Sequence, residues 1–154
     1  MNQLATFAAG CFWRVEAKFS SLDGVQETSV GFMGGTIREP TYEEVSNHTT
    51  GHAEVVQVSY NPEKISYEQL LSTFWEIHES ISDKQQDQNR GSQYRSVIFH
   101  HNDTQKIEAE QSKLLMRKSA IPPHSDTTTI IPVSTFWRAE EEHQQYFAKH
   151  SIGT

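Results

Sequence analysis

Residues 4–22 read LATFAAGCFWRVEAKFSSL, and this stretch sets the start of the fold. Its first part, Leu4 to Ala9, is a short apolar run that is typical of a buried strand. Apolar residues then recur at three- and four-residue spacing, which predicts one face of a helix. These residues are Phe12, Val15, Phe19 and Leu22. The one cysteine of the chain, Cys11, therefore falls where a strand turns into a helix, and the N-terminal end of a helix favours a thiolate.

Length and composition indicate one globular domain, which we expect to span residues 1–154. The chain is 35% hydrophobic and 21% charged, with a formal net charge of −7. An acidic balance argues against binding to nucleic acid or to an anionic membrane surface, because both prefer a basic face. No run approaches a membrane span, and one cysteine excludes an intramolecular disulfide. We therefore expect a cytoplasmic protein, and a monomer.

Periodicity further along the chain predicts alternating strands and helices. We expect strands near 28–32, 56–60, 95–100 and 128–133, helices from 66 to about 78, near 104–118 and near 139–149, and loops over 36–50 and 79–93. Ser66 and Gln69 have the spacing of a capping box at the start of the second helix. The order β-α-β-β-α-β predicts an α+β two-layer sandwich with a ferredoxin-like split βαβ core, followed by C-terminal helices and a strand.

Several residues besides Cys11 have side chains that could take part in a reaction. Glu54 stands at the mouth of a predicted strand, where an apolar pocket would raise its pKa and let it hold a proton near neutral pH. Glu16 competes for this role, but it lies five residues after Cys11 and points to another side of the helix, so we prefer Glu54. The phenols of Tyr42 and Tyr94 are suited to donate hydrogen bonds to a substrate oxygen.

Metal and phosphate chemistry are not indicated. The chain has eight histidines, but it lacks an HExxH motif and a cysteine pair that would join them as ligands. No Gly-rich phosphate loop is present, since Gly34-Gly35 alone is a turn signal. We therefore expect neither a bound metal nor a bound cofactor.

Taken together, the motifs resemble those of the type A peptide methionine sulfoxide reductases, over about residues 4 to 148. The matching segments are Gly10-Cys11-Phe12-Trp13 with Val15-Glu16, Pro40-Thr41-Tyr42, Gly51-His52-Ala53-Glu54, Tyr67 to Trp75, Gly91-Ser92-Gln93-Tyr94-Arg95-Ser96, and Ala139-Glu140-Glu141 with His143-Gln144. The resemblance implies reduction of the S-epimer of methionine sulfoxide, free or in oxidised proteins and peptides. It also implies an α+β fold around a split βαβ core.

The same resemblance implies a role for each matching position. Cys11 resembles the nucleophile, Glu54 the acid that protonates the sulfoxide oxygen, and Tyr42 and Tyr94 the phenols that hold this oxygen. The implied substrate-binding residues are Phe12 and Trp13, which form a wall for the S-methyl group, together with His52 and Asn89. The family often has Asp at the position of Asn89. Asn keeps the hydrogen-bonding capacity but lacks the charge, so we expect an active site whose rate or pH profile differs modestly.

Regeneration of the enzyme is where the chain departs from many members of the family. Those members carry a second, resolving cysteine, whereas Ser46 falls near one such position and no other cysteine occurs. An outside thiol, namely thioredoxin, glutaredoxin or glutathione, is therefore expected to attack a Cys11 sulfenic acid directly.

Two other functions agree with the same residues. One is a cysteine hydrolase or acyltransferase in which His52 is the base for Cys11. The other is a non-catalytic module that binds oxidised methionine without turnover. Activity on esters, and release of substrate oxygen in a single turnover, distinguish these alternatives from a reductase.

Overall fold

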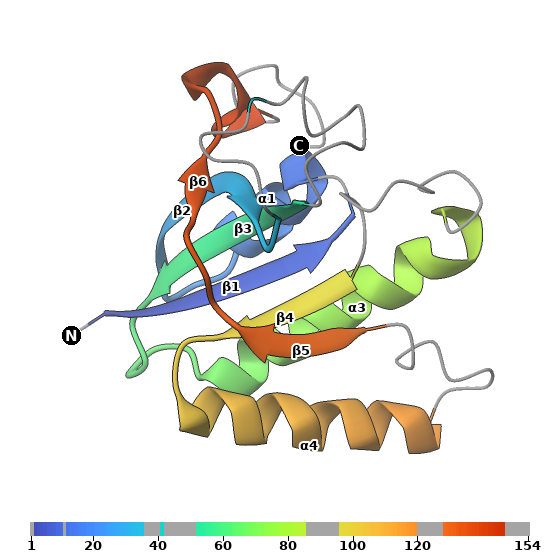
Figure 1. The fold of residues 1–154 in the computed structure, drawn as a ribbon. Helices are drawn as coiled ribbons and strands as arrows, with labels where there is room; N and C mark the ends of the chain where they lie inside the picture. Colours follow the sequence, from blue (N-terminus) through green and yellow to red (C-terminus); the bar gives the residue numbers. More distant parts are fainter. Residues whose placement is uncertain are drawn as a thin grey trace.

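The computed structural model describes residues 2–10, 12–35, 41, 52–85, 96–119 and 128–146. In this part of the chain six strands form one mixed sheet, which has helices packed against it (Figure 1). The strands are β1 (Gln3–Ala9), β2 (Val25–Met33), β3 (Ala53–Tyr60), β4 (Ser96–His100), β5 (Thr129–Pro132) and β6 (Trp137–Arg138). The helices are α1 (Phe12–Ser20), α3 (Tyr67–Gln85), α4 (Asp103–Ser119) and the short 3-10 helix η3 (Glu141–His143).

The sheet has the order β5-β4-β1-β3-β2-β6. Its centre, β4-β1-β3-β2, is antiparallel throughout and forms the split βαβ core together with α1 and α3. At one edge β5 pairs in parallel with β4, and at the other edge β6 pairs antiparallel with β2. The predicted α+β class with a ferredoxin-like core is confirmed, and the C-terminal strands extend its two edges.

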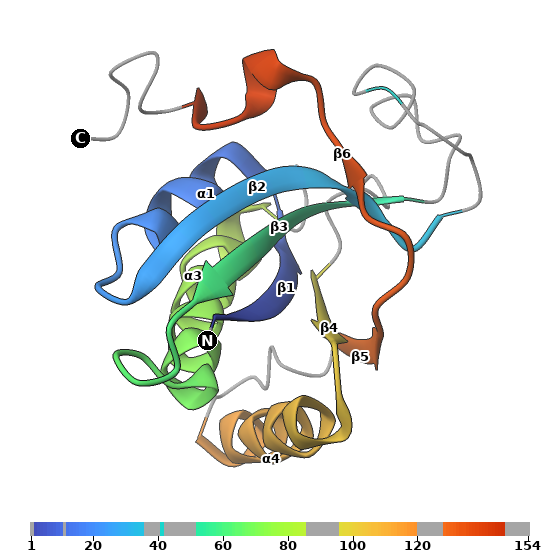
Figure 2. The same ribbon diagram turned by 90° about the vertical axis from the view of Figure 1, so that its left-hand side faces the viewer.

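The main core lies between the sheet and its helices. Alternate residues of β3 face the helices, because successive side chains of a strand point to opposite sides of the sheet. Val56 and Val58 are fully buried in this core, beside Phe19 of α1 and Phe74 of α3. Figure 2 shows α1 and α3 on the same side of the sheet. Glu54 has the parity of Val56, so the strand directs its side chain toward this helical layer.

A smaller apolar cluster covers the other face of the sheet. It contains Met33, Val55 and Phe99, and the chain between β5 and β6 crosses it with Phe136 (Figure 2). Gly31 of β2 allows this crossing, because a Cβ atom there would collide with the Trp137 carbonyl oxygen and the Phe136 ring. The C-terminal segment therefore wraps around the sheet and returns to the side of α1.

Local signals in the sequence predict most element boundaries well. The predicted capping box forms, since Ser66 N–H donates to Gln69 Oε1 at 2.8 Å and Gln69 N–H donates to Ser66 Oγ at 3.1 Å. Gly24, with φ of 100°, makes the turn that ends the first helical unit, as Asp23-Gly24 suggests. The predicted loop over 36–50 lies outside the described residues apart from Thr41.

The prediction of a loop from residue 79 is wrong over its first part, because α3 continues to Gln85. Residues 67–85 contain no Gly or Pro, and adding residues to a capped helix is much easier than starting one. Polar composition alone therefore does not end this helix.

The predicted helix over 139–149 is also wrong over residues 139–145. These residues form only the 3-10 helix Glu141–His143, Gln145 has a positive φ of 54°, and Tyr146 is the one described residue of the range that is α-helical. The side chain of Gln144 pairs with the backbone of Val30, accepting its N–H at 2.8 Å and donating to its carbonyl at 2.9 Å. These contacts with β2 replace the hydrogen bonds that a continuing helix would have made.

Candidate active site

The N-terminus of α1 and the start of β3 meet at a buried carboxylate. Phe12, the first residue of α1, donates its backbone N–H to Glu54 Oε1 at 3.2 Å. Glu54 is completely buried. Phe12 follows Cys11 directly in the sequence, so this hydrogen bond ties Glu54 to the residue next to the predicted nucleophile. The first backbone N–H of the helix, which could otherwise favour a nearby thiolate, therefore donates to Glu54.

Burial raises the pKa of Glu54 from 4.5 to about 8, and the Phe12 hydrogen bond opposes this rise. In the described part of the chain the second carboxyl oxygen, Oε2, has no hydrogen-bond partner. A protonated Glu54 thus carries an O–H group that no described residue accepts. Such a group is suited to donate a proton to a substrate atom near neutral pH.

An aromatic cluster surrounds the first turn of α1. Phe12 is buried and packs on Phe32 of β2, with ring centroids 5.7 Å apart. Trp13 is partly exposed and stacks on Tyr146, with centroids 4.0 Å apart and planes 12° from parallel. Its indole N–H also donates to His143 Nδ1 at 3.2 Å. The two residues that were expected to form an apolar wall are therefore side by side and fixed from several directions.

The C-terminal segment contributes residues that the analysis of the sequence did not identify as part of the site. His143 bonds Trp13 through Nδ1, and its Nε2 lies 3.4 Å from a carboxyl oxygen of Glu140. Tyr146 provides the ring on which Trp13 stacks. The only sequence signal for this part of the site was that residues 139–144 match a motif of the family. Periodicity could not show that it folds back onto Trp13, because this contact spans 130 residues.

His52 is buried beside the start of β3, and its Nδ1 accepts the backbone N–H of Gly35 at 3.0 Å. A neutral imidazole with Nδ1 as acceptor carries its proton on Nε2. In this state one nitrogen is already engaged and the other is protonated. The geometry therefore disfavours His52 as the general base of a cysteine hydrolase.

The other buried carboxylate of α1, Glu16, has a different environment. Thr28 Oγ1 donates to Glu16 Oε2 at 2.8 Å, and Gln145 donates from its backbone N–H to Oε1 at 2.7 Å and from its side chain to Oε2 at 2.8 Å. Both oxygens are thus occupied by donors from two other segments. This set of contacts agrees with the preference for Glu54 as the acid.

The remaining predicted site residues, Cys11, Tyr42, Asn89 and Tyr94, lie outside the described residues. Four others are described: Phe12, Trp13, His52 and Glu54. The structure brings Phe12, Trp13 and Glu54 together around the start of α1. Within the described ranges no three His, Cys, Asp or Glu side chains are grouped as metal ligands, and no helix is long and apolar enough to cross a membrane.

A buried carboxyl with a raised pKa and an aromatic cluster meet at the start of α1 in an α+β sandwich, and this is the kind of environment that an enzyme active site provides. A family model described as peptide methionine sulfoxide reductase matches residues 3–154. The chain therefore belongs to the peptide methionine sulfoxide reductase family, and it is an oxidoreductase of that class.

Individual relatives agree with this membership. A peptide methionine sulfoxide reductase MsrA from Methanoculleus marisnigri is 54% identical over 97% of this chain and 91% of its own length. The solved methionine sulfoxide reductase A of Corynebacterium diphtheriae has a TM-score of 0.85 at 31% identity, and the match covers 99% of this chain and 77% of that protein.

A yeast relative adds a structure with a partner. Reduced Mxr1 from Saccharomyces cerevisiae has a TM-score of 0.78 at 28% identity, over 99% of this chain and 88% of that protein. Mxr1 is also known in complex with Trx2; that structure has a TM-score of 0.56 at 24% identity, over 94% of this chain and 84% of that protein.

Proposed function

We propose that this chain reduces the S-epimer of methionine sulfoxide, in proteins and as the free amino acid, through a sulfenic acid on Cys11. The observation that carries the proposal is the buried Glu54 carboxyl. Its pKa of about 8 keeps the proton on at neutral pH, and its Oε1 is bonded to the amide that follows Cys11.

Reduction of a sulfoxide needs a proton at oxygen, because the oxygen is a poor leaving group while it carries its partial negative charge. In the proposed step the Cys11 thiolate attacks the sulfoxide sulfur while Glu54 protonates the oxygen. Transfer of this oxygen as hydroxyl to Cys11 releases methionine, so the substrate sulfur is reduced by two electrons and Cys11 is oxidised to sulfenic acid. Tyr42 and Tyr94 donate hydrogen bonds to the same oxygen.

Selection of the substrate follows from the aromatic wall. Trp13 and Phe12 offer an apolar surface that suits an S-methyl group and one arrangement of oxygen around the sulfur. The stack of Trp13 on Tyr146 and its hydrogen bond to His143 hold this surface in one place. His52 and Asn89 complete the proposed substrate-binding residues.

Turnover then requires a thiol from outside. Cys11 is the one cysteine within the 154 residues, so these residues cannot form a disulfide among themselves. A thiol attacks the sulfenic acid, which releases water and forms a mixed disulfide with Cys11. A second thiol then attacks this disulfide, which frees the Cys11 thiol and leaves a disulfide between the two reductant thiols. The complex of the related Mxr1 with Trx2 supports a protein as the thiol donor. A single catalytic domain, monomeric and located in a reducing cytoplasm, agrees with this dependence.

The decisive experiment compares peptides that carry S- or R-methionine sulfoxide, with dithiothreitol as reductant. Wild type is expected to reduce the S-epimer only, and Cys11→Ser to reduce neither. Dimedone labelling of Cys11 after one turnover, together with one equivalent of methionine, identifies the sulfenic acid. Substrate binding without loss of oxygen would instead leave a binding module, and ester cleavage would indicate a hydrolase.

The reductant is tested with thioredoxin, glutaredoxin and glutathione in separate assays. Mass spectrometry of Cys11 is expected to find a mixed disulfide with the thiol that supports turnover. Continued cycling in the absence of any added thiol contradicts the proposed regeneration.

A further inference from the structure

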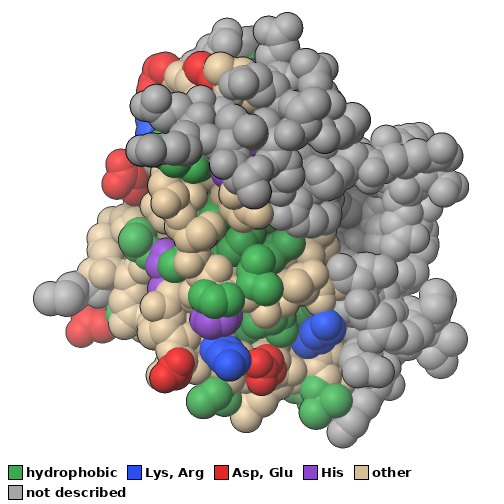
Figure 3. Space-filling model, in the orientation of Figure 1, with side chains coloured by type: hydrophobic (Ala, Val, Ile, Leu, Met, Phe, Trp, Pro, Cys, Tyr) green, Lys and Arg blue, Asp and Glu red, His purple; other side chains and the backbone are tan. Residues whose placement is uncertain are grey.

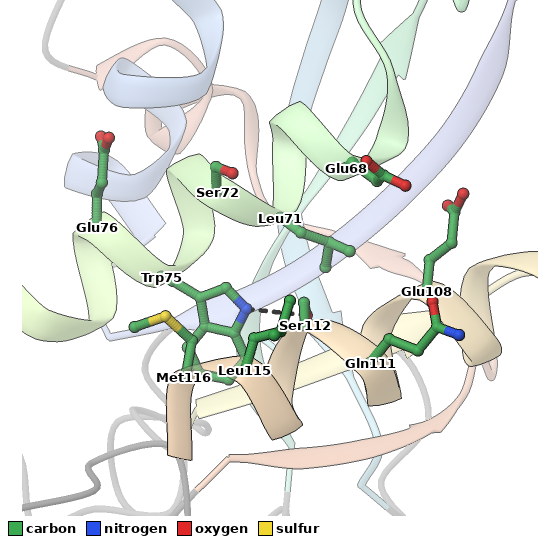
Figure 4. A pocket seen from close by; sticks show the side chains of 10 residues that line it. All are labelled: Glu68, Leu71, Ser72, Trp75, Glu76, Glu108, Gln111, Ser112, Leu115 and Met116. Carbon is green, nitrogen blue, oxygen red and sulfur yellow. Dashed lines mark hydrogen bonds between the residues drawn. The ribbon is translucent and has the colours of Figure 1, made fainter. Parts of the chain in front are cut away.

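A groove runs between α3 and α4, on the helical layer of the molecule and outside the candidate active site. Its volume is about 480 Å³. Figure 4 shows its lining residues, which are Glu68, Leu71, Ser72, Trp75, Glu76, Glu108, Gln111, Ser112, Leu115 and Met116. None of these side chains takes part in the proposed chemistry. The groove is therefore a surface feature that the reductase function leaves unexplained.

The floor of the groove is apolar. Trp75 lies at its centre, and its indole N–H donates to Ser112 Oγ at 3.0 Å, so this polar atom is satisfied within the wall (Figure 4). Leu71 of the same helix also lines the groove, and Leu115 on the opposite helix is 66% exposed. Ile107 and Leu114 of α4 are also exposed but do not line this groove, and Leu114 lines a separate hollow with Lys113. On the face shown in Figure 3, hydrophobic side chains lie among charged ones at the lower edge, over α4.

The rim of the groove is acidic. Glu68 and Glu108 lie near one another at one end, and Glu76 lies at the other end (Figure 4). Among the described residues none of these three carboxylates takes part in an ion pair. Partial burial and then the charge of Glu68 raise the pKa of Glu108, so these two carboxylates lie close enough for each to disfavour the charged form of the other.

We propose that this groove binds a cationic amphipathic segment of an oxidised polypeptide substrate. Apolar side chains of such a segment would cover Leu115 and the floor, while its Lys and Arg residues would pair with Glu68, Glu76 and Glu108. A second copy of this chain is a poorer occupant, because it would bring the same carboxylates to the groove. An anionic membrane surface is repelled by the same three charges.

A substrate chain suits the position of the groove. Both views place α4 at the opposite end of the molecule from α1 and β6 (Figures 1 and 2). A compact reductant must cover Cys11, whereas a long polypeptide can reach the groove with one segment and present methionine sulfoxide with another. Docking of one segment raises the effective concentration of the other at the active site. This inference rests on the proposed function for its kinetic consequence, but the docking itself is independent of turnover.

Docking is tested without catalysis by fluorescence anisotropy of a labelled helical peptide of Leu and Lys that lacks methionine. Wild type is expected to bind this peptide and not to bind a peptide of the same length that is made of Leu and Glu. Glu68→Lys/Glu108→Lys is expected to weaken binding by about tenfold or more, and Leu115→Ser by several-fold. The matched control is Glu27→Lys/Glu110→Lys, which makes the same change in net charge at two exposed carboxylates outside this groove and is expected to change binding less than about twofold.

The kinetic test joins the same cationic peptide to methionine sulfoxide through a flexible Gly-Ser linker. The joined substrate is expected to have a KM about tenfold lower than free methionine sulfoxide, with little change in kcat. Glu68→Lys/Glu108→Lys is expected to abolish this advantage, and Glu27→Lys/Glu110→Lys to retain it.

The possible outcomes separate the two proposals. If the groove variant and the control variant weaken binding equally, the attraction is a general effect of net charge and the docking groove is overturned. Equal binding of the cationic and the acidic peptide would overturn it as well. Concentration-dependent dimerisation that Leu115→Ser abolishes would assign the groove to a second copy and overturn the substrate role. Failure to reduce free methionine sulfoxide refutes the proposed function, while the anisotropy result still decides whether the groove binds the peptide.

Discussion

Two buried carboxyl groups lie at α1 and differ in their hydrogen-bond partners: Glu16 belongs to the helix, and Glu54 of β3 contacts its first residue. Glu16 accepts hydrogen bonds on both oxygens, from Thr28 and from Gln145. Glu54 accepts one, from Phe12, and its Oε2 has no partner in the described part of the chain. Equal burial therefore leads to different chemistry. Hydrogen-bond donors favour the charged form of a carboxyl group, whereas burial favours the protonated form, and burial is the larger cause of the raised pKa of Glu54.

The largest effect is expected from Glu54→Gln, which removes the acid and retains an acceptor for the Phe12 N–H. We expect kcat/KM for an S-sulfoxide peptide to fall by roughly 10²–10⁴, the usual contribution of a general acid. Steady-state rates with dithiothreitol measure this, and circular dichroism verifies the fold. A loss of less than about tenfold would show that Glu54 is not the acid.

The pH dependence of stability is expected to show the raised pKa of Glu54. Between pH 4.5 and about 8 the folded protein keeps a proton that the unfolded chain releases. The stability from this group is complete below pH 4.5 and is lost as the pH rises through about 8, by a few kcal/mol in total. Urea unfolding of wild type and Glu54→Gln at about pH 5, 7 and 9 measures it. Parallel profiles for the two proteins would refute a raised pKa.

The same substitution at the other carboxylate, Glu16→Gln, is expected to affect stability more than chemistry. The new NH₂ group faces donors from Thr28 and Gln145, so at least one hydrogen bond is lost in a buried place. We expect the free energy of unfolding to fall by about 1–3 kcal/mol, with less than a tenfold change in kcat. Glu27→Gln, an exposed change on β2, is the control. A kcat loss as large as that of Glu54→Gln would remove the distinction between the two groups.

The smallest effect is expected at His143, where the C-terminal segment reaches the aromatic wall. His143→Phe keeps a ring beside Trp13 but removes the acceptor of its indole N–H. We expect KM for a sulfoxide peptide to rise a few-fold, about 1 kcal/mol, with kcat nearly unchanged. Glu140→Gln alters the other side of His143 and leaves the Trp13 acceptor in place. An effect confined to kcat would mean that His143 does not position the substrate.

Local patterns were sufficient for much of the fold. Alternation in β3, helical spacing in α1 and the Ser66–Gln69 box act within a few residues, so the sequence displays them directly. The family resemblance also named Glu54 as the candidate acid and Phe12 and Trp13 as substrate-binding residues, and the structure brings these three residues together. The two-residue strand β6 gave no comparable signal, because its pairing with Gly31 and Phe32 depends on a distant segment.

The sequence by itself determined the chemical groups, the order of the elements in the split βαβ core and the resemblance to the family. Only the tertiary structure decided which buried carboxylate is partnered, how His143 reaches Trp13, and why residues 141–145 leave the helical path that their pattern predicts. The physical reason is that these outcomes depend on hydrogen bonds and burial between segments more than 100 residues apart, such as Gln144 with Val30 and Gln145 with Glu16. Helical periodicity describes one segment at a time and does not contain the partner that competes with it.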